Sequence, residues 1–264
     1  MKLKYPKKSL GQNFLTDKNI IKIIVNAGEI QKNDIVLEVG PGTGNLTEEI
    51  LSKDPKKIFA VEKDKYLINK LNERFNKKIT LINEDILVVD EKKYSKHPMI
   101  VFGNLPYNIS TQILIKWVRF NNINNTFKKF ILMFQKEVAD RIIAKTNEKN
   151  YGRLAILSSW KLNIKKIIDI SPNSFYPIPK VTSTVLLIEP KSKFFNLKNT
   201  KNLEHITNVF FNQRRKMIKK PLNIIFKNVN EISKKLNIDI NDRPQNLSPL
   251  KYFEICEEYE NLGF

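Results

Sequence analysis

Short apolar runs alternate with segments of helical spacing over roughly the first half of the chain. The runs are rich in Ile, Val and Phe and fall at residues 34–39, 58–62, 79–82, 99–102 and 130–134. The segments between them predict helices at residues 45–51, 66–75 and 111–120, and a further helix from the last run through Ala144. Strands that are apolar throughout and alternate with helices are typical of a parallel sheet covered on both faces.

Two further strands are expected at residues 164–170 and 184–188, on either side of a proline-rich loop. Residues 171–180 hold too many prolines for a helix, because proline lacks an N–H and clashes with the preceding turn. A strand pair of this kind can close a parallel sheet. The first part of the chain is therefore predicted to be an α/β domain with a mostly parallel seven-stranded sheet and helices on both faces.

The pattern changes near residue 190, and no strand signal continues beyond it. Apolar residues at helical spacing predict a helix over residues 203–219, ended by Pro221. Ser248 and Pro249 read as an N-cap followed by proline at the first helical position, which predicts the start of a last helix. We therefore expect a domain boundary at residues 188–192, between a domain of residues 1–190 and an all-helical domain of residues 191–264.

The net charge is strongly positive, at +19 for 264 residues, with a pI of about 9.8. This excess favours a phosphate-rich partner such as a nucleic acid. A Lys-rich solvated surface is the alternative, because a chain rich in Lys, Asn and Ile is typical of an AT-rich genome.

Cysteine and histidine give no sign of a disulfide or a metal site. Cys256 is the only cysteine, so neither an intrachain disulfide nor a thiolate metal cage can form, and a buried structural thiol is expected. His97 and His205 lack metal-ligand spacing. The basic N-terminal residues precede no apolar signal region, and no run reaches the length of a membrane span, so a cytoplasmic protein is expected.

Glycines and acids follow the ends of three predicted strands. Residues 40–44 read Gly-Pro-Gly-Thr-Gly, where glycines let the backbone approach a ligand beside the N–H groups of a helix N-terminus. Their Gly-x-Gly-x-Gly spacing disfavours a dinucleotide site. Glu62 can accept hydrogen bonds from ribose hydroxyls, and Asp85 suits an adenine amino group. Each feature alone is common at a turn, but together they indicate a nucleoside pocket.

The next strand ends in Asn104, Leu105, Pro106 and Tyr107. An adenine or cytosine amine is a poor nucleophile because its lone pair is delocalised into the ring. The Asn104 side-chain oxygen and the Leu105 carbonyl can hold both amine N–H bonds, Pro106 fixes the chain direction, and Tyr107 offers a face for stacking. A sulfonium methyl donor needs little leaving-group help, so positioning and electrostatics supply most of the catalysis, and no general base is evident. This site predicts methyl transfer to a planar amine, although an Asn-Pro turn also occurs in ordinary loops.

With these residues in place, the chain resembles the small-subunit ribosomal RNA adenine dimethyltransferases of the KsgA type over almost its whole length. The matching motifs are residues 10–15, 38–44, 102–111, 135–138, 151–154, 175–181 and 211–216. The resemblance implies a Rossmann-like class I methyltransferase domain with a small helical C-terminal domain. It also implies that S-adenosylmethionine supplies two methyl groups to the N6 amine of each of two adjacent adenosines near the 3′ end of the RNA. The expected partner is a pre-ribosomal small subunit, bound by a monomer.

The resemblance also assigns roles to individual residues by position. The donor or its surroundings should be contacted by Gln12, Asn13, Leu15, Gly40, Gly42, Glu62, Asp85 and Asn104. Phe175 should stack on the target base opposite Tyr107. The ribosomal substrate should be gripped by Arg214, Arg215, Lys216, Lys219 and Lys220, which would otherwise be a solvated helix face.

Two other functions compete with this interpretation. A macrolide-resistance methylase shares the fold but acts on large-subunit RNA; the Asn-Leu-Pro-Tyr form, the long proline-rich loop and the Asn-Gln-Arg-Arg-Lys segment favour the small-subunit enzyme. A non-catalytic ribosome-assembly factor could keep the fold, but the intact Glu62, Asp85 and Asn104 argue against it.

Overall fold

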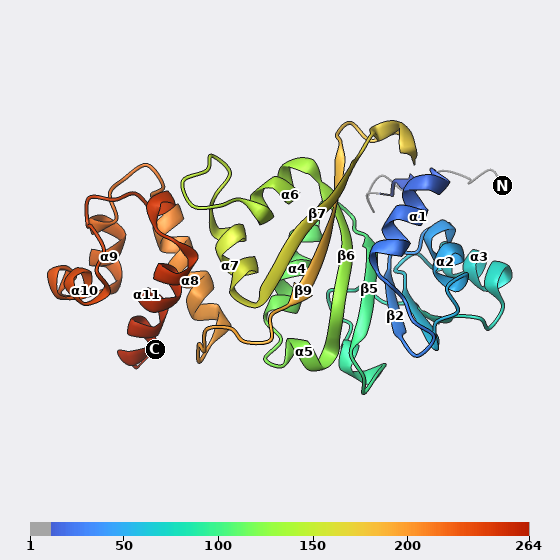
Figure 1. Ribbon diagram of the computed structural model, residues 1–264, viewed down its shortest axis with the longest axis horizontal. Coiled ribbons are helices and arrows are strands. Elements are labelled where there is room, and N and C mark those ends of the chain that lie inside the picture. The colour runs from blue at the N-terminus through green and yellow to red at the C-terminus, as the bar shows by residue number, and fades with distance from the viewer. Residues whose placement is uncertain (1–11, 264) are drawn as a thin grey trace. The chain divides into compact units, whose positions relative to one another are not determined.

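The computed structural model describes residues 12–263, which form two compact units (Figure 1). One unit comprises the described chain up to Ala139 together with Asn163–Pro190, and the other comprises Asp140–Leu162 and the chain from Lys191 onward. The second unit thus includes a segment that the expected division at 188–192 leaves in the first. The reason lies in helix α7 (Arg153–Lys161), which is buried along most of its length and packs against the C-terminal helices α8 and α11.

The first unit is built on a seven-stranded sheet with strand order β4-β3-β2-β5-β6-β9-β7. Its strands are β2 (Ile35–Val39), β3 (Lys57–Val61), β4 (Thr80–Ile82), β5 (Met99–Asn104), β6 (Phe127–Gln135), β7 (Leu162–Ile170) and β9 (Ser183–Pro190). Strands β2 to β6 pair in parallel, and β9 runs antiparallel to β6. The mostly parallel sheet predicted from the sequence is therefore confirmed.

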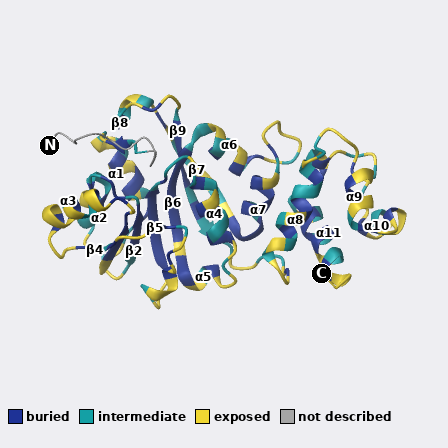
Figure 2. Cartoon of the chain, turned by 180° about the vertical axis from the view of Figure 1, so that it is seen from behind, coloured by how far each residue is buried: buried dark blue, intermediate teal, exposed yellow. Residues whose placement is uncertain are grey.

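Helices cover both faces of this sheet (Figure 1), which explains why its central strands are apolar without alternation. These helices are α1 (Lys18–Ala27), α2 (Asn45–Leu51), α3 (Lys65–Phe75), α4 (Ser110–Val118), α5 (Ile123–Thr126) and the start of α6 (Lys136–Ile143). Val36, Leu37 and Val101 have no exposed surface, and the buried centre of the sheet is visible in Figure 2. Helix α1 was not predicted, although Asp17 caps it by accepting hydrogen bonds from the Asn19 and Ile20 amides.

A second, two-stranded ladder joins the N-terminal segment to the proline-rich loop. Strand β1 (Phe14–Leu15) pairs antiparallel with β8 (Phe175–Tyr176), and the Thr16 amide donates to the Ser174 carbonyl at 2.9 Å. No local pattern predicts this pairing, because its partners are distant in sequence. The ladder brings the N-terminal segment over the carboxyl edge of the large sheet.

The second unit is helical over its described residues. Besides α7 it contains α8 (Thr200–Phe211), α9 (Lys219–Ile225), α10 (Val229–Leu236) and α11 (Pro249–Asn261). The Ser248 cap of the last helix is confirmed, since its hydroxyl accepts from the Lys251 amide. The continuous helix predicted over 203–219 is wrong. It ends at Phe211, and Pro221 lies in the first turn of α9, where proline is tolerated because the N–H is unpaired there anyway.

None of the described helices is both long enough and apolar enough to span a membrane. Within the same residues, no group of three or more His, Cys, Asp or Glu side chains is arranged to hold a metal ion. Cys256 is fully buried, as expected for a structural thiol, and burial raises the pKa of that thiol.

Candidate active site

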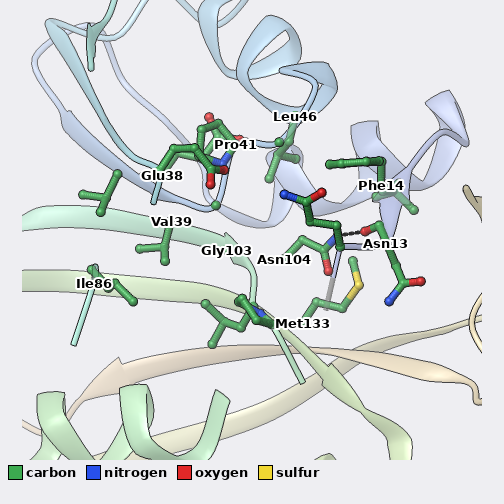
Figure 3. Close-up of a pocket in the computed structure, with 18 of the residues that line it drawn as sticks. Asn13, Phe14, Glu38, Val39, Pro41, Leu46, Ile86, Gly103, Asn104 and Met133 are labelled. Carbon is green, nitrogen blue, oxygen red and sulfur yellow. Dashed lines mark hydrogen bonds between the residues drawn. The ribbon is translucent and has the colours of Figure 1, made fainter. Parts of the chain in front are cut away.

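A cavity opens where β2, β3 and β5 end, at the edge where parallel α/β sheets bind their ligands (Figure 3). The structure brings together at this cavity all but one of the predicted donor and acceptor residues of the first unit. These lining residues are Gln12, Asn13, Leu15, Gly40, Gly42, Glu62, Asp85, Asn104, Leu105, Pro106 and Tyr107. The exception is Phe175.

The glycine turn after β2 forms one wall of the cavity. Gly40, Gly42 and Gly44 all have positive φ, between 58° and 84°, a conformation that side chains rarely adopt. A Cβ atom on Gly42 would lie 2.7 Å from the ring of Phe14, so the N-terminal segment packs directly on the turn. The Gly40 amide donates to the Val61 carbonyl at 2.9 Å and thereby fastens the turn to the end of β3.

Glu62 lines the cavity immediately after β3 and is only 9% exposed. Its Oε1 accepts the Asp64 amide at 2.8 Å. Burial raises the pKa of the Glu62 carboxyl, while backbone N–H groups of Asp64 and Gly42 partly offset that rise. Asp64 in turn caps α3 and accepts a 3.1 Å hydrogen bond from Gln12 Nε2, which ties the N-terminal segment to the same wall.

Asp85 follows β4 and is held by two donors. Lys63 Nζ lies 2.8 Å from Oδ2, and the Leu87 amide donates to Oδ1 at 2.9 Å. The Lys63 ammonium is the main reason that the pKa of this carboxyl is lowered, so Asp85 is an ionised acceptor at neutral pH. Sequence reasoning missed Lys63. The available signal was its position directly after Glu62, at the end of β3. Because the parallel strands β3 and β4 end side by side, a residue there lies close to Asp85, which follows β4.

Asn104 ends β5, and its amide group is oriented by the N-terminal segment (Figure 3). Its Nδ2 donates to the Asn13 carbonyl at 2.7 Å. This contact engages the donor side of the amide and leaves Oδ1 as an acceptor. A side chain fixed in this way can accept a hydrogen bond from an amine without first having to rotate.

Tyr107 is held by a residue that follows the proline-rich loop. Its hydroxyl lies 2.6 Å from the hydroxyl of Ser183, the first residue of β9, and burial raises the pKa of the phenol. Tyr107 lies within a turn that is closed by the Ile109 amide, which donates to the Pro106 carbonyl at 3.1 Å, and this turn leads into α4. Ser183 orients the ring, and no sequence motif pointed to that role.

Phe175 differs from the sequence-based expectation. It is 2% exposed, belongs to the hydrophobic core and does not line the cavity, so its ring offers no face to a base in this structure. The reason is the β1–β8 ladder, where successive side chains point to opposite faces. Phe175 therefore points inward, while the ring of Tyr176 is 56% exposed.

Glu38 is a further cavity residue to which sequence reasoning gave no role. It is 1% exposed and accepts a hydrogen bond from the Thr47 hydroxyl at 2.6 Å. Burial raises the pKa of Glu38 to about 7, and the charge of Glu62 adds to the rise. The available signal was a carboxylate inside an otherwise apolar strand, because a carboxylate is costly to bury unless it is paired or hydrogen-bonded.

The predicted basic residues of the second unit do not lie on one helix face. Arg214, Arg215 and Lys216 lie in the turn after α8, and Lys219 and Lys220 begin α9. All are exposed except Arg214, which is half-buried and donates a hydrogen bond to the Lys149 carbonyl. Arg214 therefore stabilises the unit itself, whereas the other four side chains are presented to solvent.

Two solved structures resemble the whole chain. A dimethyladenosine transferase from Plasmodium falciparum matches with a TM-score of 0.79 and 25% identity, covering 95% of this chain and 98% of that one. The 23S rRNA methyltransferase ErmE matches with a TM-score of 0.70 and 21% identity over 94% of this chain and 99% of that one, a likeness of fold alone. The Rossmann-like methyltransferase fold is thus confirmed.

Relatives in sequence are closer. A protein from Pelagibacter ubique (strain HTCC1062), named ribosomal RNA small subunit methyltransferase A, is 57% identical over 256 residues, or 97% of each chain. A protein of the same name from Ehrlichia ruminantium (strain Gardel) is 44% identical over 95% of this chain and 96% of its own length. Residues 4–261 match the family model described as ribosomal RNA adenine dimethylase. The chain therefore belongs to the ribosomal RNA adenine dimethylase family.

Proposed function

We propose that this enzyme dimethylates the N6 amines of two adjacent adenosines near the 3′ end of small-subunit ribosomal RNA. The family methylates ribosomal RNA adenine with S-adenosylmethionine as donor, and the relatives named above are small-subunit methyltransferases. The observation that carries the proposal is the Asn104 amide, held by the Asn13 carbonyl so that its oxygen remains an acceptor. It lies at the same cavity as the glycine turn, Glu62 and Tyr107.

The residues of the cavity fit such a donor. Gly40 and Gly42 keep side chains off the turn against which the nucleoside would lie, and Glu62 is a buried carboxylate suited to ribose hydroxyls. Asp85 is an ionised acceptor suited to the adenine amine. When bound, the donor supplies an electrophilic methyl group on a positively charged sulfur.

The acceptor side of the cavity provides positioning. The Asn104 side-chain oxygen and the Leu105 carbonyl would accept the two N–H bonds of the target amine, which directs its lone pair toward the methyl group. Tyr107, fixed by Ser183, provides a face for the flipped base. Stacking and hydrogen bonding of this kind raise the rate by orientation, without a general base.

The proposal extends to the state of the substrate. We infer that the protein acts as a monomer in the cytoplasm on a partly assembled small subunit, with residues 191–264 as the RNA-binding domain. The exposed Arg215, Lys216, Lys219 and Lys220 and the net charge of +19 support contact with RNA phosphates.

Methyl transfer from labelled S-adenosylmethionine to undermethylated small subunits tests the function. We expect N6,N6-dimethyladenosine in small-subunit RNA and none in large subunits or in naked large-subunit RNA. Labelling of large subunits alone would replace the proposal with a macrolide-resistance activity. Absence of donor binding by calorimetry would instead indicate a non-catalytic assembly factor that keeps the fold.

A further inference from the structure

A buried charge cluster lies behind the loop that carries Asp85. Lys116, near the end of α4, donates from one ammonium group to three oxygens: the Ile86 carbonyl at 2.7 Å, the Val89 carbonyl at 2.5 Å and Glu91 Oε1 at 2.8 Å. These three contacts use all three hydrogens of the ammonium. The Lys116 side chain is 19% exposed and that of Glu91 is fully buried.

The cluster is anchored in the core rather than at the surface. Glu91 begins the short helix η2 (Glu91–Lys93), and its Oε1 also accepts a 2.6 Å hydrogen bond from Trp117 Nε1. Trp117 is completely buried and packs against the ring of Phe130, with 5.0 Å between the ring centroids. Because desolvation offsets much of the attraction within a buried charged pair, the pair is weak evidence for a role in stability alone.

Lys116 contacts the loop between β4 and η2 at two backbone carbonyls. Asp85 organises the first turn through the Leu87 and Val88 amides, but the carbonyls of Ile86 and Val89 point to Lys116. Ile86 and Asp85 both line the cavity, on the side where the donor's adenine would bind. The charge of Lys116 also reaches Asp85, where it adds to the larger effect of Lys63 in lowering the pKa of the carboxyl.

We propose that Lys116 is a positioning residue for donor binding, which holds the Asp85–Ile86 segment against the adenine of S-adenosylmethionine. The inference rests on the proposed function, because it assigns Asp85 to the adenine. Lys116 does not itself line the cavity. It would act through the backbone of Asp85 and Ile86, which do, from the helix α4 that follows the Asn104–Tyr107 turn.

The test compares one variant that removes both charges of the buried cluster with one that removes only the charge of Glu91. Lys116→Met with Glu91→Gln removes both charges, and the introduced amide oxygen still accepts from Trp117. Glu91→Gln alone keeps Lys116 and its two carbonyl contacts. Calorimetry with S-adenosylmethionine should give about tenfold weaker binding for the double variant and a change of less than about threefold for the single variant. The affinity for small-subunit RNA should be unchanged in both.

The kinetic constants should also change for the donor and not for the RNA. The KM for the donor should rise in the double variant, while the KM for RNA and the kcat at saturating donor remain close to wild type. Wild-type donor affinity in the double variant, or equal losses of donor and RNA affinity, would overturn the proposal and leave Lys116 a purely structural residue. Failure of the wild-type protein to bind the donor at all would reject the proposed function itself.

A second variant keeps the proposal testable should the double variant fail to fold. Lys116→Arg retains the charge beside Glu91, but a planar guanidinium cannot reproduce the three contacts of the ammonium. It should also weaken donor binding with RNA affinity unchanged. Unchanged donor affinity in this folded variant would overturn the proposal.

Discussion

The acids of the active site and the basic residues of the second unit are held in different ways. Glu38 and Glu62 are almost completely buried; Glu38 accepts a hydrogen bond from Thr47 in α2, and Glu62 accepts one from the Asp64 amide. Arg215 and Lys216 lie exposed in the turn after α8. The acids therefore lie in a fixed low-dielectric environment, whereas the basic residues are proposed to act through their charge.

This difference predicts two kinds of mutational response. Removing a buried, hydrogen-bonded group at the cavity should cause a large and specific loss, because its partners are left unpaired. Removing an exposed cation should cause a small loss that depends on salt and adds to the losses at other positions.

Asn104→Ala should have the largest effect. The amide is proposed to hold the target amine as it attacks, so turnover should fall by about 100-fold or more, as when one preorganised hydrogen-bonding group is removed from a catalytic site. RNA affinity should change little. Single-turnover methylation of undermethylated small subunits measures the rate, and filter binding of the same subunits measures affinity. Near-normal turnover would remove Asn104 from the chemistry.

The pH dependence of stability tests the burial of Glu38. Its pKa in the folded protein is about 7, above the ordinary 4.5, so the folded state binds its proton more tightly than the unfolded state. The stabilisation from protonation is complete below pH 4.5 and is lost as pH rises through 7. Glu38→Gln should reduce the fall in unfolding free energy between pH 5 and pH 8, by at most about 3 kcal/mol.

Urea unfolding at the two pH values measures this difference. Glu62, whose pKa is also raised by burial, lies nearby and contributes in the same direction, so Glu38→Gln should reduce the pH dependence without abolishing it. Glu84→Gln, at a carboxylate that is exposed, serves as the control. An unchanged pH dependence in Glu38→Gln would mean that the carboxyl is not held in a low-dielectric site.

Glu62→Ala should have the next largest effect, confined to the donor. Loss of a charged acceptor for the ribose hydroxyls should weaken donor binding by on the order of 1–3 kcal/mol. Glu62→Gln, which keeps the shape and one acceptor oxygen, should lose less. Calorimetry with S-adenosylmethionine measures both variants, and equal affinity for the wild type and Glu62→Ala would remove this acid from the pocket.

The strand ends of the cavity were predictable because local sequence determines them. An apolar run fixes where each strand ends, and parallel strands end at one edge, so Glu62, Asp85 and Asn104 had to lie close together. The glycine turn was equally predictable, since Gly40, Gly42 and Gly44 take the positive φ that glycine favours. These inferences needed only the order of elements along the chain.

The contacts that the sequence did not reveal join distant segments. The Asn13 carbonyl that orients Asn104, the Ser183 hydroxyl on Tyr107 and the Lys116 contacts to the Asp85 loop all depend on tertiary packing. The inward placement of Phe175 depends on the β1–β8 ladder, whose strands are too short to show a pattern. The break after Asn212 was missed because apolar spacing continues across it, whereas the backbone hydrogen bonds change there from the helical i→i−4 pattern to the i→i−3 pattern of turns.

The smallest effect is expected from Arg215 and Lys216, the two exposed cations of the turn after α8, here called the basic turn. If Arg215 and Lys216 contact RNA phosphates, replacing both by Ala should flatten the dependence of log affinity on log salt by about 0.7 per contact for single-stranded RNA, or about 0.9 for a duplex-like substrate. Arg214 is left unchanged, because its contact with the Lys149 carbonyl makes it part of the fold. Donor affinity should remain that of the wild type, since these residues lie outside the first unit.

The control for this test is the double replacement of Lys227 and Lys234 by Ala. These two exposed lysines belong to the same unit but lie outside the basic turn. It removes the same net charge, so it separates direct phosphate contact from a general effect of charge. We expect a flatter salt slope for Arg215→Ala with Lys216→Ala and a slope close to wild type for the control. Equal slopes in the two double variants would mean that the basic turn is a solvated surface. Cations elsewhere on the chain would then have to provide the contacts with RNA phosphates.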